Sequence, residues 1–197
     1  MERISDIKKL SDNRYLNLYE LDATFRDGSR APYYVASRRK SEETIKASTH
    51  DNQADGVILY GVYGEEKDKV VLIRQYRPPL DRFAIEFPAG LIDDGEEPGE
   101  AALRELREET GYKGELKKLS DRAYSSPGLT DEFLIFARVE IDPAVQGEIQ
   151  TDFDEAESIE TFLVAPDKLN EFLENARRNG DVVDAKVVAY AFSTDLV

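Results

Sequence analysis

The residues of this chain with the clearest chemical potential are three glutamates in one predicted helix. Glu105 and Glu109 stand four residues apart, so their carboxylates would project from one helix face with about 6 Å of rise between the α-carbons, and Glu108 lies beside them. Like charges at this spacing oppose helix formation, but hard cations that prefer oxygen ligands would offset the repulsion. A solvated helix in which Arg104 and Arg107 balance the acids explains these glutamates equally well.

Composition removes several other kinds of chemistry. The 197 residues include no cysteine, which excludes a disulfide framework, a thiol nucleophile and a thiolate metal site. The one histidine, His50, lies in a polar stretch typical of a loop, and we expect it to be solvated rather than catalytic. With 41 acidic and 26 basic residues the net charge is -15, so we expect no nucleic-acid or membrane partner. An anionic substrate would need divalent cations to mediate its approach.

Length and hydropathy favour a soluble, core-forming chain of one domain with an appendage. No apolar stretch approaches the roughly 18 residues that span a bilayer. The first residues lack the basic segment and apolar run of a secretory signal, and we expect a cytoplasmic location.

The first 52 residues are expected to form a small β region. An imperfect alternation over residues 15–25 predicts a strand, Asp27-Gly28 is a turn signal, and residues 33–37 can return as the second arm of a hairpin. We therefore divide the chain into an N-terminal β-hairpin region, residues 1–52, and a main domain, residues 53–197.

The main domain mixes predicted strands and helices, which indicates the α/β class. Strands are expected over residues 56–63, 70–76, 83–87, 133–141 and 158–164, and helices over 98–109, 166–178 and 184–192. Pro98 suits a first helical position and Gly111 a left-handed residue beyond the helix end. Residues 148–160 are expected to form an acidic connection.

The spacing around the glutamates favours the metal site over the solvated helix. The segment resembles the Nudix hydrolase box at every defined glycine, arginine and glutamate position, which are Gly90, Glu96, Arg104-Glu105, Glu108-Glu109 and Gly111. Tyr112 departs from the aliphatic residue that usually ends the box. The resemblance implies an α/β/α sandwich with a mixed sheet, in which the box forms a loop, a helix and a loop.

The resemblance also implies roles for the box residues, with Mg²⁺ as the cofactor and Mn²⁺ as a possible substitute. The implied metal positions are Ala89, through its backbone carbonyl, Glu105, Glu108 and Glu109. Glu108 and Arg104 are carried over as catalytic, because Arg104 would hold the glutamates in place. Glu96 would orient the helix rather than bind metal.

Two further segments, residues 85–96 and 124–132, are similar to the ADP-ribose pyrophosphatase subfamily, in which a proline lies about fifteen residues beyond the box, as Pro127 does. Residues 126–128 would otherwise be read as an ordinary turn. The implied reaction is hydrolysis of ADP-ribose, or of a related nucleotide sugar, to a nucleoside monophosphate and a sugar phosphate. Hydrolases of GDP-mannose or UDP-glucose remain alternatives.

Four residues match substrate-binding positions of that subfamily. Arg77 and Arg38 match positions that grip the substrate, since an arginine fork can pair with two phosphate oxygens, although both would also suit a solvated surface. Glu86 resembles a residue that borders the metal and the terminal ribose. Tyr33 lies near the position where the subfamily presents an aromatic ring, often from the partner subunit, to stack on the base, although packing within the hairpin explains Tyr33 and Tyr34 equally well.

A carboxylate is the expected general base in a chain with one histidine. Glu132 resembles the subfamily's catalytic glutamate, with Glu155 and Glu157 as the reserve candidates. The family also implies a homodimer formed partly by the N-terminal hairpin. The rival from another class is a module that senses a nucleotide sugar without hydrolysing it, and the complete set of box glutamates argues against it.

Overall fold

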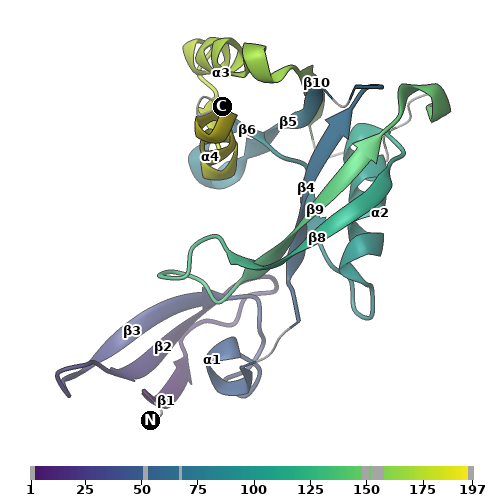
Figure 1. The fold of residues 1–197 in the computed structure, drawn as a ribbon. Coiled ribbons are helices and arrows are strands. Elements are labelled where there is room, and N and C mark those ends of the chain that lie inside the picture. Colours follow the sequence, from purple (N-terminus) through teal and green to yellow (C-terminus); the bar gives the residue numbers. More distant parts are fainter. Residues whose placement is uncertain (1–2, 51–52, 67, 148–150, 152–157, 195–197) are drawn as a thin grey trace. The chain divides into compact units, whose positions relative to one another are not determined.

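A computed structural model describes residues 3–50, 53–66, 68–147, 151 and 158–194 (Figure 1). Contacts between residues divide the chain into two compact units. The N-terminal unit comprises Met1–Asp55 and Arg122–Leu134, and the main unit comprises Gly56–Asp121 and Ile135–Val197.

The described part of the N-terminal unit contains a three-stranded antiparallel sheet of β1 (Ile4–Lys9), β2 (Asn17–Thr24) and β3 (Arg30–Ser37), followed by the short helix α1 (Lys46–Thr49). The predicted hairpin of β2 and β3 is confirmed. Strand β1 was not predicted, because a register shift between Ile4 and Ile7 breaks the period of two that identifies a strand. A small core forms where Tyr19, Leu21 and Val35 pack with Ile45.

The main unit is built on a mixed sheet that contains eight strands in the described residues, in the order β11-β6-β5-β4-β9-β8, with β10 beside β5 and β7 beside β4. Its strands are β4 (Gly56–Tyr63), β5 (Lys69–Arg77), β6 (Arg82–Glu86), β7 (Ala89–Leu91), β8 (Glu115–Tyr124), β9 (Phe133–Ile141), β10 (Ile159–Val164) and β11 (Val182–Val183). Strand β11 pairs with β6 in parallel, whereas β5 pairs with β4, β6 and β10 antiparallel.

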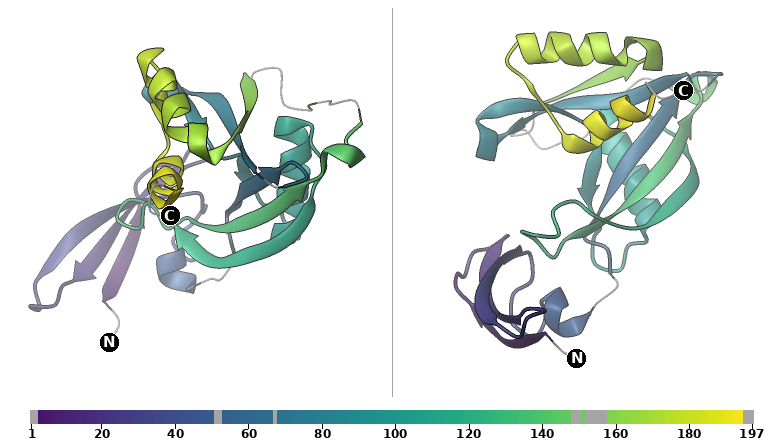
Figure 2. Two further views of the ribbon diagram at one scale, coloured as in Figure 1. Left: turned by 45° about the horizontal axis from the view of Figure 1, so that its top comes forward. Right: turned by 60° about the vertical axis from the view of Figure 1, so that its left-hand side comes forward.

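Helices cover both faces of this sheet, as an α/β/α sandwich requires (Figure 1, Figure 2). Helix α2 (Pro98–Thr110) packs on one face, where Leu59 of β4 belongs to its core. Helices α3 (Leu169–Arg178) and α4 (Ala185–Thr194) lie on the other face, where Tyr190 of α4 contacts Tyr60 and Phe87. Short 3₁₀ helices span Pro78–Leu80, Pro143–Val145 and Pro166–Lys168.

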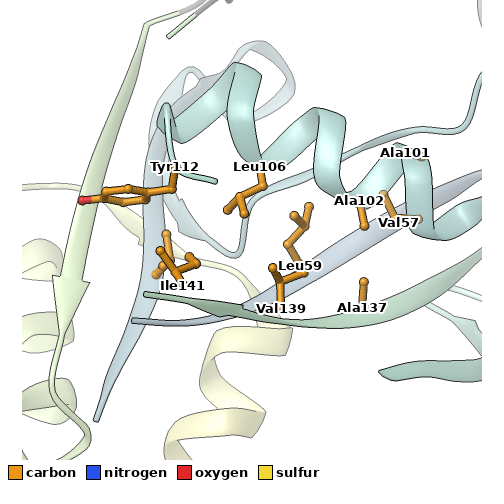
Figure 3. Packing of buried hydrophobic residues seen from close by; sticks show 10 residues of the cluster. Val57, Leu59, Ala101, Ala102, Leu106, Tyr112, Ala137, Val139 and Ile141 are labelled. Carbon is orange, nitrogen blue, oxygen red and sulfur yellow. The ribbon is translucent and has the colours of Figure 1, made fainter. Parts of the chain in front are cut away.

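Helix α2 begins and ends where local signals predict. Pro98 occupies the first turn, Glu97 and Glu100 form a capping box, and Gly111 beyond the end has φ of +71°. Figure 3 shows the apolar face of α2, which includes Ala102 and Leu106, directed onto side chains of the sheet. This burial fixes the helix, so that the polar residues on its other positions are held in defined places.

Three other expectations about secondary structure change. Strand β8 was missed because most of its ten residues are exposed and polar. Strand β7, which begins at Ala89 and pairs with β4, was not predicted either. The acidic connection expected over 148–160 lies largely outside the described residues, and its last two residues belong to β10. Among the described helices, none is both long enough and apolar enough to cross a membrane.

Candidate functional site

Arg104 of α2 lies at the centre of a group of carboxylates. Its Nε and Nη2 donate to the two oxygens of Glu96 at 2.9 Å each, and its Nη1 donates to Glu105 at 2.8 Å and to Glu108 at 3.1 Å. Nη2 also donates to the carbonyl of Leu91 at 2.9 Å. We call Arg104, Glu96, Glu105 and Glu108 the Arg104 cluster. It places three carboxylates around one guanidinium and therefore carries net negative charge.

Glu105 and Glu109 both meet strand β7. Glu109 is buried, with 7% of its surface exposed, and its Oε2 accepts a hydrogen bond from the Ala89 N–H at 3.1 Å. The Glu105 carboxylate lies so close to Gly90 that a Cβ there would come within 1.8 Å of the Glu105 Cδ. The four-residue spacing thus brings both carboxylates to one helix face, as predicted, and a Cβ at position 90 would force the Glu105 carboxylate to move.

Burial and hydrogen bonding act differently on these acids. Burial raises the pKa of Glu105, hydrogen bonding and charge from Arg104 lower it, and the neighbouring charges of Glu108 and Glu96 raise it again, so the pKa is raised overall. Hydrogen bonding to Arg104 holds the pKa of Glu96 below its usual value. The pKa of Arg104 is raised, first by its hydrogen bonds to Glu96. Burial is the largest cause of the raised pKa of Glu105, and a cation would relieve the smaller contribution from the charges of Glu108 and Glu96.

The chemistry of these donors suits a hard divalent cation, which prefers carboxylate and carbonyl oxygens. Within the described residues, however, no three acidic side chains converge on a single point. Arg104 engages Glu105 and Glu108, while Glu109 bonds to Ala89. A carboxylate has more lone pairs than one hydrogen bond uses. The absence of a Cβ at Gly90 lets the Glu105 carboxylate lie against strand β7. The chemistry of the donors therefore suits such an ion, whereas their present hydrogen bonds direct them to Arg104 and Ala89.

Arg77 and Glu86 form a bidentate ion pair on β5 and β6. The Arg77 Nε lies 3.2 Å and 3.0 Å from the two carboxylate oxygens of Glu86, and Nη2 also donates to this carboxylate. Burial alone would lower the pKa of Arg77. The hydrogen bonds and charge of Glu86, with smaller contributions from the charges of Glu109 and Asp184, outweigh burial, so the pKa is raised overall. The structure thus brings together two residues that the sequence suggested separately and places them within the electrostatic reach of Glu109 on α2.

The other sequence-predicted residues belong to the N-terminal unit. The Tyr33 hydroxyl donates to the Gly128 carbonyl at 2.8 Å, Arg38 is exposed, and Glu132 is partly buried. His50 is exposed at the end of α1 with φ of +50°, in line with its expected solvation. Glu155 and Glu157 lie outside the described residues.

Tyr33 also lines a cavity of about 370 Å³ within the N-terminal unit. Apolar side chains, which include Leu21 and Val35, form part of its wall, and Tyr124 and Arg122 add an aromatic ring and a cation. Tyr33 thus contributes to packing through its hydrogen bond to Gly128, and its other side faces the cavity.

A buried ionic network surrounds Asp55, and it was not predicted from the sequence. The Asp55 carboxylate, 7% exposed, accepts hydrogen bonds from Arg39 at 3.1 Å, from the Phe133 N–H at 3.0 Å and from Lys46. The Lys46 Nζ also lies 4.0 Å from the centre of the Phe133 ring. We call Asp55, Lys46 and Arg39 the Asp55 cluster. No local signal could have found it, because Phe133 is 78 residues from Asp55 in the chain.

The sequence of this chain is similar to those of known proteins. A family model described as the NUDIX domain matches residues 52–187. A nudix hydrolase of Caenorhabditis elegans is 41% identical over 143 residues, which cover 70% of this chain and only 64% of that protein. The ADP-ribose pyrophosphatase of Saccharomyces cerevisiae is 32% identical over 187 residues, which cover 92% of this chain and 77% of that protein.

The fold also matches a solved structure. The crystal structure of an ADP compounds hydrolase aligns with a TM-score of 0.67 at 21% sequence identity and covers 96% of this chain and 89% of that one. At this identity the match shows a shared fold, and it agrees with the α/β/α sandwich expected from the sequence.

Proposed function

The chain belongs to the NUDIX domain family, and from that membership we propose that it hydrolyses the pyrophosphate bond of ADP-ribose or of a closely related nucleoside diphosphate sugar. The products are a nucleoside monophosphate and a sugar phosphate. The observation that carries the proposal is the Arg104 cluster, in which the carboxylates of Glu96, Glu105 and Glu108 surround Arg104 and that of Glu105 lies against Gly90 of β7.

Nudix hydrolases generally use divalent metal ions, and we propose Mg²⁺ for this chain, with Mn²⁺ as a substitute. Glu105, Glu108, Glu109 and the Ala89 carbonyl would hold it. When bound, such ions would neutralise the charge of the pyrophosphate and lower the pKa of a bound water, so that the water can attack at neutral pH. Arg104 keeps the acids in position through its hydrogen bonds to Glu105 and Glu108.

We assign substrate binding to Arg77, Glu86, Arg38 and Tyr33. The planar guanidinium of Arg77 can hold two phosphate oxygens at once, and its bidentate pairing with Glu86 fixes its orientation. Arg38 offers a second, exposed cation. The open side of Tyr33 supports a contact with the base.

Glu132 is our choice for the general base that accepts a proton from the attacking water. Its neighbour Asp131 is tied to the Ser37 hydroxyl at 2.9 Å and to the Lys46 N–H at 3.1 Å, so this part of the chain is well anchored. A Glu132→Gln variant should lose turnover with little change in KM and lose the acidic limb of the pH profile. A loss confined to Glu155→Gln or Glu157→Gln would move the assignment to that residue.

Residues 1–52 are also proposed to form part of a homodimer interface. Strand β3 lies at one edge of its sheet, and it exposes Tyr33 and Tyr34. Sedimentation at micromolar concentration should give the mass of a dimer, and a monomer would contradict this proposal.

The proposed function is tested with a panel of substrates. The purified protein is incubated with Mg²⁺ and ADP-ribose, GDP-mannose or UDP-glucose, and nucleoside monophosphate is followed by chromatography. We expect AMP from ADP-ribose at the highest kcat/KM. A preference for another nucleotide sugar would change the substrate but keep the chemistry, whereas binding without any monophosphate would support the sensing module.

A further inference from the structure

Gln75 of β5 carries a buried oxygen with no hydrogen-bond partner. The residue is 7% exposed, and its Oε1 is the one buried side-chain polar atom in the described part of the chain that lacks a partner. Leaving a buried acceptor unpaired costs free energy, which a packed apolar side chain would avoid. A polar group kept at such a cost is a candidate for binding something other than the protein itself.

The strand registers place Gln75 on the face of the sheet that carries the proposed site. Gln75 and Arg77 are two residues apart on β5, so both side chains leave on the same face. Across β6, Gln75 faces Ala84, and Glu86 is the next residue of β6 on that face. On the other side of β5, Gln75 pairs with Ile159 of β10. Neither Ala84 nor Ile159 has a side-chain donor, and the Arg77 guanidinium donates to Glu86 through Nε and Nη2.

Helix α2 covers this same face. Val71, four residues before Gln75 on β5 and thus on the same side, packs in the core that contains Leu106 of α2. Gln75 therefore shares one face of the sheet with Arg77, Glu86 and the helix of the Arg104 cluster.

The chemistry of the orphaned atom restricts its ligand. An amide oxygen accepts hydrogen bonds, so its partner must donate one. Pyrophosphate oxygens at neutral pH are acceptors, whereas sugar hydroxyls donate. Two residues along a strand advance by roughly 6.6–6.8 Å, a separation that a sugar joined to a phosphate at Arg77 can span.

We propose that Gln75 recognises the sugar of the substrate by accepting a hydrogen bond from one of its hydroxyls. This inference rests on the proposed function and deepens it, because it adds a specificity-determining residue to the same site. The hydroxyl belongs either to the terminal sugar or to the nucleoside ribose, and fragments of the substrate distinguish the two.

Gln75→Met keeps the length of the side chain and removes the acceptor. Inhibition constants are measured for a methylene-bridged analogue of ADP-ribose, for ADP, for ribose 5-phosphate and for inorganic pyrophosphate. We expect the variant to bind the methylene analogue about tenfold more weakly, as the loss of one hydrogen bond predicts, and to bind pyrophosphate like the wild type. A parallel loss for ribose 5-phosphate identifies the terminal sugar, and a parallel loss for ADP identifies the nucleoside ribose.

The melting temperature of Gln75→Met provides a second test. Because it removes an unpaired buried oxygen, the protein without ligand should melt about 2–4 °C higher. A purely structural glutamine would give the opposite sign, since its replacement would lower the melting temperature. Leu72→Met is the matched control, because Leu72 is fully buried on β5 but lies on the opposite face, and it should change none of the inhibition constants.

Besides a lowered melting temperature, two binding results would overturn the inference. A loss of affinity for pyrophosphate as large as that for the methylene analogue would assign Gln75 to the phosphates or their metal, and unchanged affinity for every ligand would deny it any role in binding. If Gln75→Met does not fold, Gln75→Leu carries the same measurements. Wild-type protein that hydrolyses no nucleotide sugar would refute the proposed function, whereas an active wild type with an unaffected variant would refute this inference alone.

Discussion

The Arg104 cluster and the Asp55 cluster use the same kinds of side chain in opposite proportions. In the main unit, three carboxylates surround one guanidinium, whereas in the N-terminal unit one carboxylate receives two cations and a backbone N–H. The second arrangement satisfies its buried charge and joins distant segments of the chain. The first keeps an excess of negative charge that divalent cations can balance. From this difference in charge ratio we propose that the Arg104 cluster is a binding site and that the Asp55 cluster is a structural network.

The largest expected effect follows from removing a carboxylate of the site. Glu105→Gln and Glu109→Gln should each lower kcat with ADP-ribose by at least about 100-fold, because each removes a charge that stabilises the transition state. Thermal unfolding without metal should stay close to that of the wild type. Glu100→Gln on the same helix is the matched control, since glutamine preserves the capping box. A Glu105→Gln protein that melts instead would show that this helix face is structural.

The Asp55 cluster should respond in the reverse way. Asp55→Asn leaves Lys46 and Arg39 without their carboxylate and should lower the free energy of unfolding by about 3 kcal/mol, measured by chemical denaturation. Turnover per folded molecule should fall far less than in Glu105→Gln. Asp12→Asn, which removes an exposed ion pair with Lys9, should not measurably change stability. Equal effects of the two substitutions would contradict the structural role of Asp55.

A smaller effect is expected from filling the space that the Glu105 carboxylate occupies. A Cβ in Gly90→Ala would collide with this carboxylate, so Glu105 would have to move and both Mn²⁺ affinity and kcat/KM should fall about tenfold. Calorimetric titration with Mn²⁺ measures the first quantity. Gly147→Ala provides the control, because a Cβ there meets no atom within 4 Å. Unchanged metal binding in Gly90→Ala would separate Glu105 from the metal.

The smallest effect concerns Glu96, which we expect to orient the helix. Arg104 holds the pKa of Glu96 below its usual 4.5, so the pair contributes its full stability above that pH and loses it as the pH falls through the lowered pKa. Glu96→Gln should therefore cost about 1 kcal/mol at neutral pH, and the difference from the wild type should shrink below pH 4.5. Denaturation at several pH values measures this, and a difference that does not depend on pH would contradict it.

Features set by neighbouring residues in the chain could be predicted from the sequence. The start of α2 at Pro98, its end before Gly111 and the approach of Glu105 and Glu109 to one side all follow from helical spacing. Strands β1 and β8 were missed, because a register shift or exposed polar residues hide their period.

Contacts between distant segments could not be predicted in this way. The pairing of Arg77 with Glu86 depends on the register of β5 against β6, and the unpaired oxygen of Gln75 depends on what three strands place around it. Each residue can be chosen from its type, but its partner is set by tertiary packing.

The proposed function requires that the carboxylates of α2 bind a divalent ion together. A crystal soaked with Mn²⁺ and a methylene-bridged ADP-ribose analogue tests this directly through anomalous scattering. We predict a manganese peak bonded to oxygens of Glu105 and Glu109, with the pyrophosphate of the analogue beside it. Bound analogue with no manganese peak at these two residues would contradict the central claim.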